Sequence, residues 1–377
     1  MKKAVLIPDS FKGTMSSSEI CAIMEERIRA FYPTAEICGS PVADGGEGSV
    51  DAFLSACGGE KRRLKAHGPW NEEIEAFYGL IDGGKTAVVE MAACAGLPLA
   101  EGRLDPSRTT TFGAGELILD AARRGAKKII VALGGSATND LGAGAAAAAG
   151  VRFFDAQGVE FVPVGGTLSK IARIDSSALA PELKNCRIIT MCDIDNPLYG
   201  ENGTAYVFAP QKGADSAMVK MLDGELRAAA SVIKAELKID VAQVPGAGAA
   251  GGMGAGMIAF FGATLQMGIE TVLDAVNFDG IIKDADCIFT GEGKIDGQSL
   301  RGKVVIGVAG RAKKFNIPVI AVVGDIGDNI EDAYGRGVSA IFSINRVSQS
   351  FAENRKRCKS DLKLTMDNLM RFIKTPL

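Results

Sequence analysis

The chain has 377 residues, which exceeds the size at which a single hydrophobic core usually stops growing, so two domains are expected. Apolar residues make up 47% of the sequence and charged residues 23%, proportions that exclude disordered, coiled-coil and collagen-like proteins. The formal net charge of -3 provides no broad attraction for nucleic acid or anionic lipid.

The N-terminal residues predict two strand, loop and helix units. Residues 4–7 form an apolar run that ends at Pro8-Asp9-Ser10, and the capping-box pair Ser16 and Glu19 then precedes apolar residues at helical spacing. Residues 36–42 predict a second strand, followed by a glycine-rich loop and a further helix.

The closing third of the chain repeats this pattern, with strands predicted at 287–290, 317–323 and 338–344 and a helix at 304–315. Strands that alternate with helices indicate a parallel sheet. We therefore expect an α/β fold in which residues 1–61 and 283–377 form one discontinuous, doubly wound, Rossmann-like domain.

The middle of the chain, residues 62–282, is expected to be an inserted domain of mixed α/β structure. Its predicted strands are 86–91, 128–133, 187–192 and 205–208. Its predicted helices lie near 113–124, 143–150, 217–237 and 252–261.

The eight cysteines form no Cys-x-x-Cys pair and lie mostly in apolar segments, as reduced thiols of a cytosolic protein do. The first apolar run is too short for a signal peptide, and no stretch has the length and apolarity of a membrane span. We expect a cytoplasmic protein with no membrane or nucleic-acid partner.

Short loops that combine glycine with charged or hydroxyl residues follow nearly all predicted strands. These loops are 10–13, 44–48, 134–140, 193–196, 291–296 and 324–325. Ligands of open α/β sheets bind outside the carboxyl ends of the strands, so the set favours a binding site over ordinary turns. With one histidine in the chain, His67, the chemistry left to such loops is that of magnesium-assisted phosphoryl transfer.

Gly246-Ala-Gly248-Ala-Ala-Gly251 matches the dinucleotide-binding fingerprint, but it does not follow a strand as that motif requires. Phosphate binding at a helix start and close packing through small residues remain its alternatives. A Walker A pattern is absent from the sequence, which disfavours a P-loop kinase.

Eight ordered segments resemble the bacterial glycerate kinase family, in particular the glycerate 2-kinases of glucarate, galactarate and glyoxylate metabolism. They include Pro8-Asp-Ser-Phe-Lys-Gly13, Pro41-Val-Ala-Asp-Gly-Gly-Glu-Gly48, Gly134-Gly-Ser-Ala-Thr-Asn-Asp140 and Thr290-Gly-Glu-Gly-Lys-Ile-Asp296. The resemblance implies a flavodoxin-like domain with an inserted second domain and an active site in the cleft between them. It also implies ATP, Mg²⁺ and the phosphorylation of glycerate to phosphoglycerate, with the 2-position favoured.

Role assignments follow from what phosphoryl transfer requires, namely neutralised phosphate charge, a positioned hydroxyl and a carboxylate that accepts its proton. Asp193 is the expected base and Asp44 the second choice, while Lys12 and Lys303 are expected as point charges for phosphate or substrate carboxylate. Substrate contacts are assigned to Ser10, Glu47, Asn196 and Lys303, nucleotide phosphates to Gly134, Gly135, Ser136, Thr138, Asn139, Gly291 and Gly293, and the metal to Glu292 and Asp296.

Three rival interpretations remain open at this stage. The first is a kinase for another small hydroxy acid, such as tartronate or a sugar acid, and the second is a non-enzymatic two-domain sensor of a carboxylate. A dehydrogenase ranks last. The expected partners are glycerate and ATP, and a homo-oligomer is compatible with the sequence, which does not specify the oligomeric state.

Overall fold

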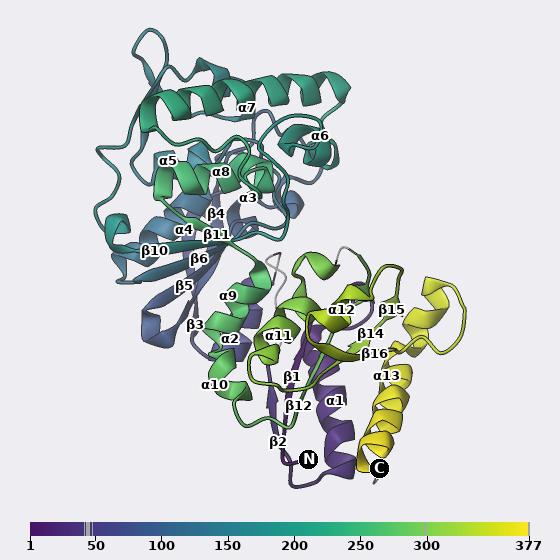
Figure 1. The fold of residues 1–377 in the computed structure, drawn as a ribbon. Helices are drawn as coiled ribbons and strands as arrows, with labels where there is room; N and C mark the ends of the chain where they lie inside the picture. Colours follow the sequence, from purple (N-terminus) through teal and green to yellow (C-terminus); the bar gives the residue numbers. More distant parts are fainter. Residues whose placement is uncertain (41, 43–45, 47, 298, 376–377) are drawn as a thin grey trace. The chain divides into compact units, whose positions relative to one another are not determined.

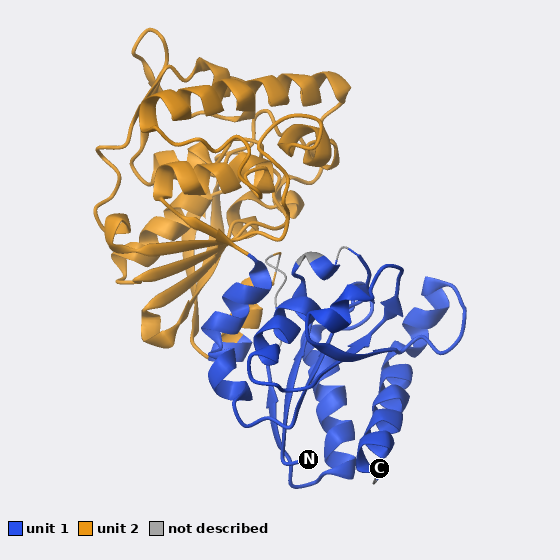
Figure 2. Cartoon of the chain, viewed as in Figure 1, with its two compact units in different colours: residues 1–44, 55–57, 267–377 blue, residues 45–54, 58–266 orange. Residues whose placement is uncertain are grey.

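The computed structural model describes residues 1–40, 42, 46, 48–297 and 299–375, which divide into two compact units (Figures 1 and 2). Unit 1 comprises Met1–Asp44, Ser55–Cys57 and Met267–Leu377, and unit 2 comprises Gly45–Leu54 and Gly58–Gln266. The helices α9 (Gly268–Ala275) and α10 (Phe278–Ile282) are grouped with unit 1, although the sequence assigned these residues to the insert.

Unit 1 contains a five-stranded parallel sheet with the strand order β16-β14-β12-β1-β2. In chain order within the unit this is 2-1-3-4-5, the order of flavodoxin-like doubly wound sheets. The α/β fold class predicted from the sequence is confirmed. The strands are β1 (Lys3–Pro8), β2 (Glu36–Gly39), β12 (Cys287–Gly291), β14 (Val319–Val323) and β16 (Val338–Ser343).

Helices cover both faces of this sheet because successive strand residues point to opposite sides. Ala4 and Leu6 of β1 face a core that α1 and α13 complete, while α11 packs against β1, β12 and β14. The predicted capping box of α1 is present, since the Ser16 side chain accepts from Glu19 N and the Glu19 carboxylate accepts from Ser16 N. The helices are α1 (Ser17–Phe31), α11 (Val304–Lys313), α12 (Asp332–Gly335) and α13 (Phe351–Lys374).

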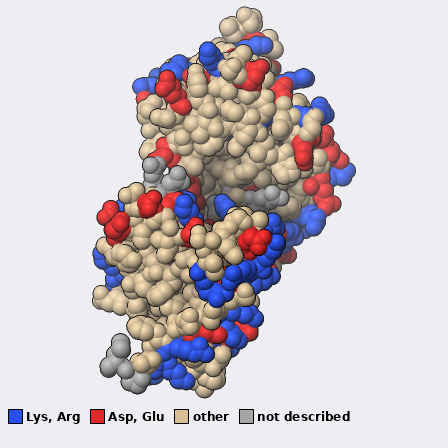
Figure 3. Space-filling model, turned by 90° about the vertical axis from the view of Figure 1, so that its right-hand side faces the viewer, with Lys and Arg blue, Asp and Glu red and all other residues tan. Residues whose placement is uncertain are grey.

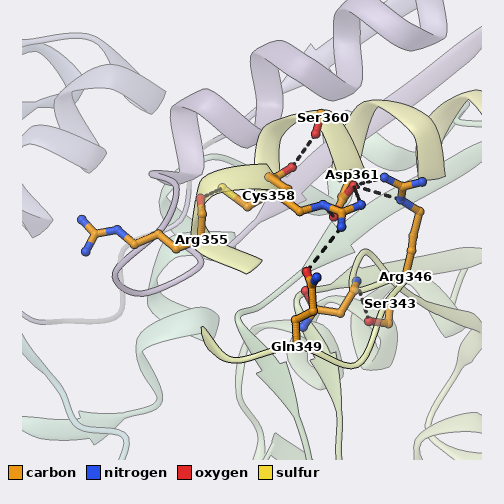
Figure 4. A network of polar contacts seen from close by, with 9 residues as sticks. Ser343, Arg346, Gln349, Arg355, Cys358, Ser360 and Asp361 are labelled. Carbon is orange, nitrogen blue, oxygen red and sulfur yellow. Dashed lines mark hydrogen bonds and ion pairs between the residues drawn. The ribbon is translucent and has the colours of Figure 1, made fainter. Parts of the chain in front are cut away.

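A buried carboxylate anchors the segment between β16 and α13 (Figure 4). Asp361 of α13 is 2% exposed and accepts from Arg346 Nε at 2.9 Å, from a second Arg346 nitrogen and from Arg357 Nη2 at 3.4 Å. Two guanidinium groups thus compensate one desolvated charge. Basic side chains gather on part of the face drawn in Figure 3, and several basic residues of α13 form ion pairs, such as Lys359 with Glu19.

Unit 2 contains a six-stranded mixed sheet with the order β11-β10-β6-β5-β4-β3. Strands β5, β6, β10 and β11 are parallel, and the β3, β4 hairpin joins β5 in antiparallel fashion. The strands are β3 (Glu60–His67), β4 (Glu73–Ile81), β5 (Thr86–Glu90), β6 (Lys128–Ala132), β10 (Arg187–Met191) and β11 (Thr264–Gln266).

The described residues of unit 2 form two hydrophobic cores. One joins the sheet to α3 and α4, and the other joins α5, α6, α7 and α8 to a small antiparallel sheet of β8, β7 and β9. The helices are α2 (Ser49–Cys57), whose last three residues are grouped with unit 1, α3 (Ala92–Ala95), α4 (Phe112–Arg123), α5 (Ala143–Ala148), α6 (Thr204–Phe208), α7 (Ser216–Leu237) and α8 (Ala249–Phe261), and the small strands are β7 (Arg152–Phe154), β8 (Glu160–Phe161) and β9 (Arg173–Asp175).

The strand predicted at 205–208 is wrong, because these residues form helix α6. Its aromatic and β-branched residues favour a strand locally. In the helix, Ala205 and Ala209 lie one turn apart and are both buried in the second core of unit 2, while Tyr206 and Val207 are exposed. Burial of the two alanines overrides the local preference. Within the described residues, no helix is both long and apolar enough to span a membrane.

We expect Asp361→Asn to lower the free energy of unfolding by about 2 kcal/mol, since hydrogen bonds to charged groups contribute roughly 1.5–3 kcal/mol and the two arginines are partly exposed. The measurement is the urea midpoint of the full chain. Glu353→Gln is the matched control, because it removes an exposed pair with Lys356 on the same helix and should cost less than about 1 kcal/mol. Equal midpoints for the two variants would contradict an anchoring role for Asp361.

Candidate active site

The parallel strands of unit 2 end in register at one edge of the sheet. Glu90 of β5 pairs with Ala132 of β6, Ala132 with Met191 of β10, and Met191 with Gln266 of β11. The loops that follow β6 and β10 therefore leave the sheet from neighbouring positions. Both loops carry residues that the sequence assigned to ligand binding.

In unit 1 the loops after β1 and β12 occupy the point where the strand order reverses. At such switch points the adjacent loops diverge, and ligands of doubly wound sheets bind there. Pro8 pairs with Gly291, and Asp9 N donates to Gly291 O at 2.8 Å. A Cβ at Gly293 would lie 3.5 Å from Lys12 N, so the two loops are in contact.

Glu292 is a buried carboxylate at this switch point, with only 5% of its surface exposed. Burial raises the pKa of Glu292 to about 7, a shift that Ser299 and Lys303 oppose and that Asp9 and Asp296 reinforce. Its Oε1 atom has no hydrogen-bond partner among the described residues. A buried acceptor without a partner is costly and points to a missing ligand or water.

The remaining predicted residues of unit 1 lie at the ends of β1 and β12, in the loops that follow these strands and at the N-cap of α11. Ser10 and Asp296 are half-buried, whereas Lys12 and Lys303 are exposed and Lys303 lies at the N-cap of α11. Gly291 is fixed by close approach, since a Cβ there would lie 2.0 Å from Val322 O. The two lysines are thus exposed to solvent, and the glycine is a packing requirement.

The loop after β6 exposes its glycines and buries its polar side chains. Gly134 and Gly135 are at least partly accessible, whereas Ser136, Thr138 and Asn139 are buried. The contact of this loop with solvent is therefore made chiefly by the glycine backbone. The side chains that the sequence assigned to nucleotide phosphates face the protein interior.

Asp140 ends this loop and is fully buried. Its carboxylate accepts from Thr111 N at 2.7 Å, Thr111 Oγ1 at 2.8 Å, Gly142 N at 3.2 Å and Gly144 N at 3.3 Å. Burial raises the pKa of Asp140, and these hydrogen bonds oppose the shift. The carboxylate thus fixes the turn into α5.

A buried lysine lies on the inner side of the same loop. Lys212 is 1% exposed, and its Nζ donates to Ser136 Oγ at 2.8 Å and to Thr138 O at 2.6 Å. Burial lowers the pKa of Lys212 to about 7, and the charge of Asp140 opposes this shift. No role for Lys212 was predicted from the sequence.

The loop after β10 presents carboxylates to solvent. Asp193 and Asp195 are both exposed, while Cys192 between the strand and Asp193 is buried. The Asn196 side chain donates from Nδ2 to Asn202 O at 2.8 Å, and the Asn196 backbone carbonyl accepts from Gly248 N at 3.0 Å. Asn196 therefore stabilises the loop through its own hydrogen bonds.

The fingerprint-like glycines at 246–251 pack closely against the other two loops of unit 2. A Cβ at Gly251 would lie 2.0 Å from Thr138 O, and one at Gly248 would lie 2.4 Å from Pro197 O. Ala250, Gly251 and Gly252 are all left-handed, so the regular part of α8 begins after them. This arrangement supports close packing through small residues and lacks the strand and turn of a dinucleotide site.

Glu90 is a second buried residue to which the sequence analysis gave no role. At the carboxyl end of β5, its carboxylate accepts from Gly48 N at 3.2 Å and from Val50 N, which caps the start of α2. Burial raises the pKa of Glu90, and these hydrogen bonds oppose the shift. Its position at the end of an apolar strand is the signal that could have revealed it.

The predicted residues thus form two sets. Unit 1 groups Ser10, Lys12, Gly291, Glu292, Gly293, Asp296 and Lys303 at its switch point, and unit 2 groups Gly134, Gly135, Ser136, Thr138, Asn139, Asp193 and Asn196 at its sheet edge. Asp44 and Glu47 lie outside the described residues.

The described residues contain no group of three or more His, Cys, Asp or Glu side chains that could hold a metal ion unaided. Mg²⁺ is usually held by one or two carboxylates together with substrate phosphates. Glu292, with its unpartnered oxygen, and the nearby Asp296 fit that donor set.

Comparison with known proteins places the chain in a family. The model described as "Glycerate kinase family" matches residues 4–374. The glycerate 2-kinase of Escherichia coli (strain K12) is 48% identical over 91% of this chain and 90% of that protein, and the glycerate kinase of Bacillus cereus is 45% identical over 97% of each. A crystal structure named "putative glycerate kinase 2 from Salmonella typhimurium LT2" has a TM-score of 0.87 at 41% identity, covering 99% of this chain and 98% of that one. The resemblance inferred from the sequence motifs is confirmed, and the chain belongs to the glycerate kinase family.

Proposed function

We propose that this chain catalyses the ATP-dependent phosphorylation of D-glycerate to phosphoglycerate. The observation that carries the proposal is the family match over residues 4–374, with curated relatives named for this activity at 45% and 48% identity. The relative at 48% identity is named glycerate 2-kinase, which favours transfer to the 2-hydroxyl. The two sets of loop residues supply groups suited to this reaction.

Binding of ATP requires donors and positive charge around its phosphates. We assign the nucleotide phosphates to the glycine backbone at Gly134 and Gly135 and to the loop around Gly291 and Gly293. Ser136, Thr138 and Asn139 contribute to this loop through their backbone, because their side chains are buried. Exposed Lys12 and Lys303 act as point charges for phosphate or for the glycerate carboxylate.

In the chemical step, the glycerate hydroxyl oxygen forms a bond to the γ-phosphorus while the bond from that phosphorus to the β,γ-bridging oxygen breaks and ADP leaves. Asp193 accepts the hydroxyl proton. Its exposed position at the carboxyl end of β10 supports this role, and Asn196 stiffens the same loop. Ser10 and Lys303 of unit 1 bind the substrate together with Glu47, so residues of both units take part. Asp44 is the alternative base.

Mg²⁺ would be held by Glu292 and Asp296 with the nucleotide phosphates, where it supplies neutralisation of phosphate charge. The unpartnered Oε1 of Glu292 supports this assignment. All eight cysteines are free thiols, which supports a cytoplasmic location, where thiols stay reduced.

The decisive experiment measures ADP release by the purified full chain, with and without D-glycerate, in Mg²⁺ and in excess EDTA. We expect release that requires glycerate and stops with EDTA, and ³¹P NMR of the product to show 2-phosphoglycerate. Faster turnover of tartronate or of a sugar acid would assign a different substrate. Glycerate binding without ADP release would replace the enzyme by a sensor.

Asp193→Asn should lower kcat by about 10²–10⁴ with little change in either KM, because general-base catalysis contributes that factor. Steady-state kinetics of Asp195→Asn provide the control, since this carboxylate is also exposed, two residues away in the same loop. A drop in kcat for Asp195→Asn with Asp193→Asn near wild type would reassign the base.

Glu292→Gln should raise the Mg²⁺ concentration needed for half-maximal rate at least about tenfold, because removal of groups around a metal typically costs 10–100-fold in affinity. Glu331→Gln, an exposed carboxylate of unit 1 next to α12, is the control and should leave the Mg²⁺ titration unchanged. An unchanged titration for Glu292→Gln would remove this residue from the metal site.

A further inference from the structure

The carbonyl oxygens of the loop after β6 are held from inside unit 2. Gly135 O accepts from Leu97 N at 2.8 Å, and Ala137 O accepts from Thr109 Oγ1 at 2.9 Å. Thr138 O accepts from Lys212 Nζ at 2.6 Å. Three carbonyls within four residues are thus bonded to donors of unit 2, and one amide of the loop, Ala137 N, in turn donates to Ala95 O at 2.8 Å.

These contacts engage three of the carbonyl oxygens that a ligand at this loop could otherwise meet. A loop binds an anion when its N–H groups point outward, and an outward carbonyl would repel the same anion. Gly134 and Gly135 are the residues of the loop that reach the surface. Their backbone presents the loop to solvent, while Gly135 O, Ala137 O and Thr138 O are held by donors of unit 2.

Lys212 is the charged donor among these three, and burial of its ammonium group costs free energy. A lysine is seldom fully buried, because its ammonium loses its hydration and needs compensating partners. Lys212 has two recorded acceptors, Ser136 Oγ and Thr138 O, both in this loop. The segment that carries it is itself fixed, since Gly213 has a φ of 98° and a Cβ there would lie 2.7 Å from Leu104 O.

Further polar atoms in the same loop have no partner. Thr138 Oγ1 and both side-chain polar atoms of Asn139 are buried and make no hydrogen bond to the described residues. Buried polar groups of this kind destabilise a fold by roughly 1–3 kcal/mol each. Stability alone therefore does not account for the polar interior of this loop, whereas a binding function does.

We propose that Lys212 is a positioning residue for nucleotide binding, which holds Ser136 Oγ and the Thr138 carbonyl and so keeps the loop at 134–139 in the backbone conformation that meets the phosphates of ATP. Thr109 assists at Ala137 O. The inference rests on the proposed function and adds to it the residues that orient the phosphate-binding loop. Lys212 itself, being buried, acts through the loop.

The test compares wild type with Lys212→Met, which keeps the length of the side chain and removes its donors. We expect KM for ATP and Kd for Mg-ADP, measured by calorimetry, to rise about tenfold or more, because hydrogen bonds to charged groups contribute roughly 1.5–3 kcal/mol and 1.4 kcal/mol is tenfold. KM for glycerate should stay within about twofold. A purely structural role would not separate the two substrates.

Thr109→Val is a second variant that removes one donor without removing a charge, and it should raise Kd for Mg-ADP in the same direction by a smaller factor. Thr190→Val is the matched control, because Thr190 Oγ1 is buried in β10 without a partner and its loss should leave ligand binding unchanged. Thermal denaturation of each variant confirms that the chain is folded.

The inference is overturned if Lys212→Met and Thr109→Val bind Mg-ADP within twofold of wild type, or if KM for glycerate rises while that for ATP does not. Failure of the proposed function gives a different result. In that case wild type releases no ADP with glycerate, and the binding of Mg-ADP by calorimetry still decides the role of Lys212.

Discussion

Parallel pairing with matched strand ends is the constraint on which both candidate sets depend. Pro8 beside Gly291 in unit 1, and Ala132 between Glu90 and Met191 in unit 2, bring chain segments far apart in sequence to one edge. Once the strand ends are aligned, the loops that follow them must run so close together that their backbones come into contact. Glycine is required where a Cβ would overlap a carbonyl, as at Gly251 and Gly291, and this explains part of the unusual glycine content.

Buried charges in this protein fall into two kinds, distinguished by their partners. Asp361 and Asp140 have their oxygens satisfied by arginines or by backbone and hydroxyl donors, and they fix a segment in place. Glu292 has an oxygen with no partner among the described residues, and its pKa is raised to about 7. Because Glu292 is buried with an oxygen that has no partner among the described residues, it carries more of the functional proposal than Asp140 does.

The fully buried strands could be predicted because parallel strands covered on both faces are continuous apolar runs, as in β1, β6 and β14. The edge strand β3 escaped prediction, since Glu60–His67 is mostly polar, as exposed edges are. Motifs located the loops but not the direction of their side chains. Lys212 could not be found from its neighbours, because the acceptors that permit its burial lie 76 and 74 residues away in sequence.

The position of β1 between β2 and β12 has a consequence for synthesis on the ribosome. β1 cannot complete its pairing until residue 291 has been made, and α13, which covers the same face as α1, is the last helix of the chain. Unit 2, whose residues are nearly continuous, can assemble while the first 44 residues wait. At about 5–20 residues per second, the N-terminal strand remains unpaired on one side for on the order of 15 to 60 seconds. During that interval its apolar edge is open to chaperones, so the order of folding runs from the middle of the chain to its two ends.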